Sequence, residues 1–68
     1  MKVIVLKDNK EIILNQVFFI AGCPNYIFEK LFSDNNGNFK YNSYKKHNNQ
    51  FVFSGEVTNN SIDDIIAA

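Results

Sequence analysis

The chain contains a single cysteine, Cys23, and a single histidine, His47, among its 68 residues. A disulfide within the chain is therefore excluded, and too few ligands remain for a structural zinc site. A domain this small buries only about 60% of the surface that its unfolded chain exposes, so its stability margin is thin. Stability must come from packing of the aromatic residues, seven Phe and three Tyr, or from a second subunit. We expect one domain over residues 1–68 without cofactor or metal, and a homo-oligomer stays open as an alternative.

The charges balance, with seven lysines against seven acidic residues and no arginine. A neutral chain is a poor non-specific binder of nucleic acid or membrane surfaces, and arginine is the best bidentate partner of phosphate and guanine. No apolar run is long enough for a signal-peptide core or a membrane span, so we expect a cytoplasmic protein that does not bind membranes. Eleven asparagines and eight isoleucines, with no tryptophan, are typical of an AT-rich genome, as in many Gram-positive bacteria and their phages.

The first half of the chain predicts a hairpin followed by a helix. Residues 3–6 and 11–14 are β-branched or apolar, and the Asp-Asn pair between them tolerates the positive φ of a tight turn. Residues 15–21 either extend the second strand or form a third, and periodicity does not decide between these. Pro24 suits the first position of a helix, and apolar residues follow it at helical spacing. We therefore predict a helix over residues 24–33.

The second half predicts another hairpin, over residues 39–57, and a short C-terminal helix that Ser61 caps. A three-residue loop over 47–49 is favoured, because a two-residue Asn-Asn turn mixes the polar and apolar faces. This loop pairs Phe39 with Val57, Tyr41 with Gly55, and Ser43 with Phe53. The predicted fold class is α+β, with an antiparallel sheet of four or five strands in two hairpins, one central helix and one terminal helix, in the order ββ(β)αββα.

Cys23 is the residue with the most obvious potential for chemistry. A thiol at the N-terminus of a helix has a lowered pKa and is a stronger nucleophile. The strand-like residues 17–20, followed by Gly22-Cys23-Pro24 and an apolar helix, resemble the active-site segment of glutaredoxins. The resemblance implies a thiol-dependent redox protein, although Asn25-Tyr26 stands where a dithiol enzyme has its second cysteine. A nucleophilic triad of Cys23 with His47 and an acid is a further, geometry-dependent alternative.

Residues 39–47 carry three lysines and no acid, with aromatic residues between them. Such a strand can stack nucleobases and follow a phosphate backbone, or it can meet an acidic protein surface. The lack of arginine disfavours nucleic acid, so a single-strand nucleic-acid-binding module is the alternative and a protein partner the expectation. The predicted partner-binding residues are Lys40, Asn42, Tyr44, Lys45 and Lys46.

By elimination, the sequence favours a protein that is not an enzyme, and no catalytic residue is predicted. A compact, aromatic-rich domain without a recognisable reaction centre suits a non-catalytic protein-binding module. The size and composition are those of small regulators or inhibitors from phages and mobile elements, which occupy a surface of a host protein. This functional prediction is an analogy of size, because a fold does not imply a function.

Overall fold

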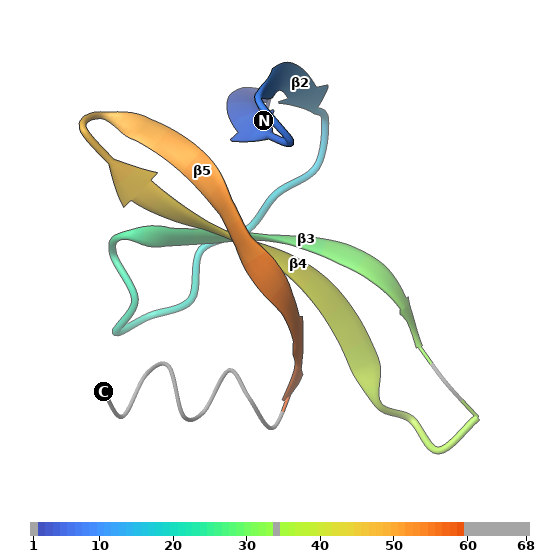
Figure 1. Ribbon diagram of the computed structural model, residues 1–68. Helices are drawn as coiled ribbons and strands as arrows, with labels where there is room; N and C mark the ends of the chain where they lie inside the picture. Colours follow the sequence, from blue (N-terminus) through green and yellow to red (C-terminus); the bar gives the residue numbers. More distant parts are fainter. Residues whose placement is uncertain (1, 34, 60–68) are drawn as a thin grey trace.

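The computed structural model describes residues 2–33 and 35–59, which form one five-stranded mixed sheet (Figure 1). The strand order is β2-β1-β5-β4-β3; β1 pairs with β5 in parallel, and every other neighbour is antiparallel. No helical element lies within these residues, so the predicted α+β class with a central helix is wrong. The strands are β1 (Val3–Lys7), β2 (Lys10–Leu14), β3 (Tyr26–Ser33), β4 (Phe39–His47) and β5 (Gln50–Thr58).

The predicted N-terminal hairpin is confirmed. β1 and β2 pair from Val3 with Leu14 to Lys7 with Lys10, leaving a two-residue turn. Asp8 in this turn has a φ of 53° and the asparagine after it a φ of 62°. A type I′ turn needs positive φ at both positions, and short polar residues adopt it at little cost.

Residues 26–33 form strand β3, where a helix was predicted over residues 24–33. Ile27 and Phe28 are adjacent and fully buried, so the strand packs on both of its faces. Adjacent apolar residues fit a doubly buried strand as well as a helix stripe, and β-branched and aromatic residues favour the strand. Pro24 lies in a turn that the backbone N–H of Tyr26 closes by donating to the carbonyl of Cys23, at 3.3 Å.

The turn between β4 and β5 consists of Asn48 and Asn49 alone, so the predicted three-residue loop is wrong. Both asparagines have positive φ, 51° and 64°, and His47 pairs with Gln50 across them. This is the two-residue hairpin geometry that the first hairpin also uses.

A bulge in β5 restores the faces that the two-residue turn was expected to mix. Tyr44 pairs with Phe53 and Ser43 with Gly55, which leaves Ser54 as the extra residue. Gly55 has a φ of 149°, and its carbonyl accepts a 2.9 Å hydrogen bond from the Ser43 hydroxyl. The bulge therefore shifts the register by one residue in the middle of the hairpin. The incorrect predicted pairs are Phe39 with Val57, Tyr41 with Gly55, and Ser43 with Phe53.

The main core lies on one face of the curled sheet, called the core face below; the opposite face is the outer face. Its buried residues come from four strands, and partly buried Val3, Val17, Phe51 and Phe53 pack against them. Tyr44 meets Phe53 edge to face, with ring centroids 5.7 Å apart. Aromatic area thus supplies part of the stability expected of so small a domain. The buried residues of this core are Val5, Leu14, Ile27 and Tyr44.

Residues 15–25 cross from β2 to β3 without forming the third strand considered for 15–21. At Phe18 this segment bridges Phe28, and each residue donates its N–H to the carbonyl of the other at 3.0 Å. Because β2 and β3 are the two edges of the sheet, the bridge joins one edge to the chain that leaves the other. The sheet therefore curls towards a small barrel that is closed by one pair of residues. The C-terminal helix predicted from Ser61 lies outside the described residues.

Candidate functional site

An open seam lies between the two edges of the sheet, next to the Phe18–Phe28 bridge. Within residues 2–33 and 35–59, the ladder of β2 is with β1 and that of β3 is with β4, and no ladder joins β2 to β3. A hollow of about 310 Å³ occupies the seam. Residues from both edge strands, β2 and β3, line this hollow. Its lining residues are Ile13, Leu14, Asn15, Gln16, Glu29 and Lys30.

Among the described residues, the Phe18–Phe28 bridge supplies the backbone–backbone hydrogen bonds of β3 next to this seam. Phe28 points its N–H and carbonyl to the seam side, where Phe18 binds both. Backbone groups alternate along a strand, so those of Lys30 point to the same side, one step beyond the bridge. The same alternation, counted from the pair that flanks the first turn, directs the backbone groups of Ile13 away from β1. The seam is thus framed by two edges that can each pair with another strand.

The side chains around the seam divide between its two faces. Leu14 belongs to the core cluster, and Glu29 lies two residues after core residue Ile27, so both stand on the core face. Ile13 and Lys30, one residue away in each strand, stand on the outer face. The lining therefore offers one apolar residue and one charged residue on each side of the sheet.

Glu29 is the only acidic residue among the described residues that line the hollow, and it is held by two neutral donors. Its Oε1 accepts hydrogen bonds from Asn42 Nδ2 at 3.2 Å and from the Tyr44 hydroxyl at 3.4 Å. Among the described residues, no lysine forms an ion pair with it; the nearest in sequence, Lys30, has its Nζ 4.1 Å from the centre of the Phe39 ring. A fixed, half-buried carboxylate without a cation therefore borders the hollow.

Burial raises the pKa of Tyr44 to about 12, and the negative charge of Glu29 and the hydrogen bond to it act in the same direction. The tyrosine is 1% exposed. It consequently stays neutral and keeps donating to Glu29 throughout the physiological range.

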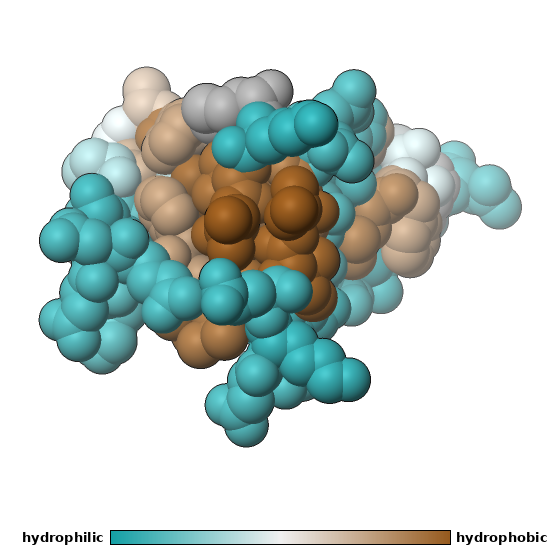
Figure 2. Space-filling view, turned by 90° about the horizontal axis from the view of Figure 1, so that it is seen from above, coloured by the Kyte–Doolittle hydropathy of each residue, from teal (hydrophilic) through white to brown (hydrophobic). Residues whose placement is uncertain are grey.

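An exposed apolar patch adjoins the seam on the β1–β2 hairpin. Figure 2 looks down on this end of the molecule and shows apolar residues ringed by hydrophilic ones. Ile4 and Ile13 pair across the hairpin on the outer face and are 53% and 61% exposed. The patch reaches the seam through Ile13, which also lines the hollow. Apolar patches with a polar rim mark interaction sites on small soluble domains.

Two of the predicted partner-binding residues lie inside the molecule. Asn42 and Tyr44 are buried on the core face, 7% and 1% exposed, where they hold Glu29. Their connection to the seam is therefore through Glu29, because neither offers a surface of its own. The sequence pattern placed these residues on an accessible strand, but the two-residue turn pairs Tyr44 with Phe53 on the core face.

The three predicted lysines are exposed, but the structure does not bring them together. Lys40 forms an ion pair with Glu56 at 3.6 Å, and Lys45 has its Nζ 5.9 Å from the centre of the Tyr26 ring. These two lysines are five positions apart, which is about 17 Å along an extended strand. Lys46 stands on the opposite face from Lys45. The basic residues thus form separate points of charge instead of one strip.

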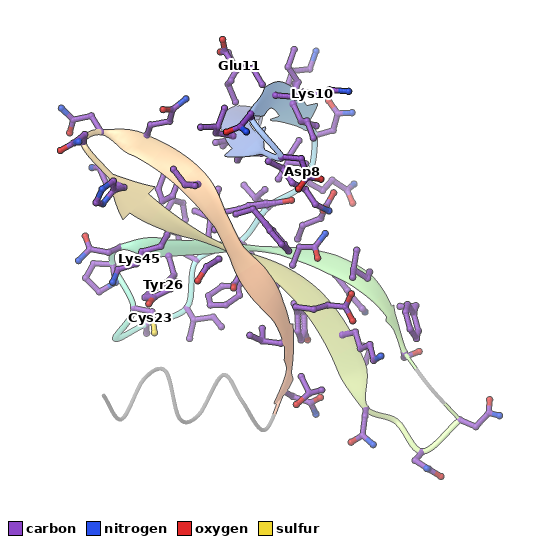
Figure 3. The ribbon with its side chains drawn as sticks, in the orientation of Figure 1. Asp8, Lys10, Glu11, Cys23, Tyr26 and Lys45 are labelled. Atoms are coloured by element: carbon purple, nitrogen blue, oxygen red, sulfur yellow. The ribbon has the colours of Figure 1, made fainter. Side chains whose placement is uncertain are left out.

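Cys23 lies in a loop and is 3% exposed, so the predicted position at a helix N-terminus does not exist. Figure 3 shows it beside Tyr26 and Lys45. Its backbone N–H donates to the carbonyl of Ile20 at 2.9 Å, and its carbonyl accepts from Tyr26. The strand-then-helix segment that resembled glutaredoxins is absent, which removes the physical basis for an activated thiol at this position. His47 ends β4 at the second hairpin turn and is exposed.

Across the described residues, no three His, Cys, Asp or Glu side chains gather closely enough to hold a metal ion. The same part of the chain contains no helix of sufficient length and hydrophobicity to cross a membrane.

Sequence reasoning did not single out Glu29 or the seam. One signal was present, since Glu29 is the acidic residue of a stretch, 26–32, in which Lys30 is the other charged residue and the rest are apolar or aromatic. An acid in such a stretch is costly to bury unless something satisfies it. The seam itself has no local signal, because it is formed by segments that are distant in sequence.

Comparison of this chain with protein-family models, with curated proteins and with solved structures gives no match. The site geometry alone therefore has to support a function.

Proposed function

We propose that this protein is a non-catalytic protein-binding module that takes up an extended segment of a partner in its open seam. The observation that supports this most directly is the hollow of about 310 Å³ between the edges of β2 and β3. A strand entering there can bond to Lys30 on one side and Ile13 on the other. Strand addition of this kind gives affinity through main-chain hydrogen bonds and specificity through alternate side chains.

The β2 edge of the seam lacks the usual protection against pairing. Natural sheets shield an edge with proline, central lysines or a covering loop. β2 has its lysine at its first position and ends in Ile12, Ile13 and Leu14. Ile13 is 61% exposed, so an added strand also removes apolar surface from water. An edge kept in this form suits a binding site.

A peptide-library selection tests the proposal. A phage-displayed library of random peptides is selected on the wild-type protein, and the selected peptides are then measured against two variants. Lys30→Pro removes the N–H that points into the seam, while the ladder with β4 stays intact because a strand edge tolerates proline. Lys30→Ala is the matched control, because it removes the side chain and keeps the N–H.

We expect peptides that bind the wild type and Lys30→Ala with similar affinity and lose at least about tenfold on Lys30→Pro, the loss expected for one or two main-chain hydrogen bonds. Thermal unfolding of both variants controls for folding. Selected peptides that bind Lys30→Pro as tightly as the wild type contradict the proposal, and so does a selection that enriches nothing.

A further inference from the structure

The seam also specifies which side chain its occupant should carry, and this inference rests on the proposed function. We infer that the bound segment has a basic residue on the core face of the sheet, opposite Glu29, between two apolar residues. The partner is thus an extended segment of the pattern apolar–basic–apolar.

The faces on which an added strand places its side chains follow from those of β3. A residue that pairs directly with Lys30 places its side chain on the same face as Lys30, the outer face. The residues before and after it place theirs on the core face, beside Glu29. Alternation in the occupant is therefore imposed by alternation in β3.

The core face of the seam carries one negative charge, that of Glu29. Glu29 borders the hollow as a carboxylate with two neutral donors and, among the described residues, no ion pair. Filling the hollow removes water from this carboxylate, which is costly unless the occupant supplies a compensating donor. An apolar or acidic side chain at this place is disfavoured, and a lysine or arginine is favoured.

The core face of the seam also has an apolar side, opposite the carboxylate. Leu14 lines the hollow on the core face, across the seam from Glu29. Lysine and arginine have apolar stems that cover such a residue while the charged end reaches a carboxylate beyond it. A short basic group such as a chain terminus lacks this stem. The core face is therefore complementary to a long basic side chain.

The outer face of the seam is apolar on the β2 side. Ile13 is exposed there and continues into the patch with Ile4. Lys30 stands on this face too, with its ammonium group over the Phe39 ring and not beside Glu29. An apolar side chain in the occupant packs on Ile13, and this accounts for the residues that flank the basic one.

The experiment repeats the peptide selection on the wild type and on Glu29→Gln. Glutamine keeps an oxygen that can accept from Asn42 and Tyr44, so the fold is preserved while the charge is lost, and thermal unfolding verifies this. Wild-type selection should enrich Lys or Arg at one position with apolar residues on both sides. Replacing that basic residue by Gln in a synthetic peptide should weaken binding to the wild type about tenfold and to Glu29→Gln by much less.

The outcomes separate the two proposals. Peptides that depend on the Lys30 N–H but show no basic preference, or the same preference on Glu29→Gln, overturn this inference and leave the proposed function standing. Peptides that ignore Lys30→Pro overturn both. A wild-type protein that sediments as a dimer at micromolar concentration, while Lys30→Pro sediments as a monomer, identifies a second copy as the occupant and also overturns the inference.

Discussion

The contact between Tyr44 and Glu29 makes the stability of the protein depend on pH in the alkaline range. Tyr44 has a pKa of about 12 in the folded protein, against 10.0 in the unfolded chain. A raised pKa means that its contribution is complete below pH 10 and is lost as the pH rises through 12, because the unfolded chain releases the proton first. At pH 11 the shift raises the unfolding equilibrium constant about tenfold relative to neutral pH, so the protein is less stable there.

Replacing Tyr44 by phenylalanine isolates this effect, because every other titrating group is shared by both proteins. Tyr44→Phe loses one hydrogen bond to a carboxylate and should be less stable at pH 7 by about 1 kcal/mol. It has no phenol to ionise, so its stability should fall less steeply above pH 9. Urea unfolding followed by circular dichroism at several pH values should give two curves that converge near pH 11. Curves that stay parallel from pH 8 to pH 11.5 would refute this reasoning about Tyr44 and Glu29.

Three further pairs of substitutions test the fold. Gly55→Ala should destabilise the fold by about 1–3 kcal/mol through backbone strain alone, since φ is 149° and a Cβ there meets nothing within 4 Å. Ser54→Ala should cost less than about 0.5 kcal/mol in the same urea unfolding measurement, and equal losses for the two variants would contradict the bulge. Asn49→Gly should raise the melting temperature and Asn49→Val should lower it, because the turn needs positive φ; the reverse order would exclude a two-residue turn. Ile27→Ala should cost about 2–5 kcal/mol as a core truncation and Ile13→Ala less than about 0.5 kcal/mol as a surface one, and equal losses would contradict the burial of Ile27 in the core.

The N-terminal hairpin could be predicted because its determinants are local. Two apolar segments flank an Asp-Asn pair, and the turn geometry follows from the φ preferences of those two residues. The same rule applies to Asn48-Asn49. The three-residue loop was predicted instead, because a two-residue turn without a bulge mixes polar and apolar residues on each face. A bulge at Ser54 and Gly55 achieves that separation, and a glycine in a strand is its only mark in the sequence.

The helix prediction failed because the spacing of apolar residues in 26–33 fits two structures. A strand that is buried on one face shows alternation, but β3 buries Ile27 towards the core and Phe28 against Phe18. This second burial depends on the loop that pairs with the edge of β3 at Phe18, a contact that no local pattern encodes. Tertiary contacts therefore decided between helix and strand.

The candidate site was the least predictable feature. The basic residues of 39–47 were chosen for their charge, and the structure separates them along β4 while it buries Asn42 and Tyr44. The seam arises because the sheet curls until β2 and β3 face each other, which is a property of the whole topology. Glu29 acquires its role only in that arrangement.

The backbone amide exchange of Lys30 in the free protein tests the open seam most directly. Lys30 and Phe28 point to the same edge of β3, and the Phe28 N–H donates to the carbonyl of Phe18 at 3.0 Å. An open seam predicts that the Lys30 amide exchanges with solvent at least about a hundredfold faster than the Phe28 amide, as expected for an edge group without a partner. NMR-detected hydrogen exchange resolves the two residues. Equal protection of Lys30 and Phe28 would show that the edge is already paired and would contradict the open seam.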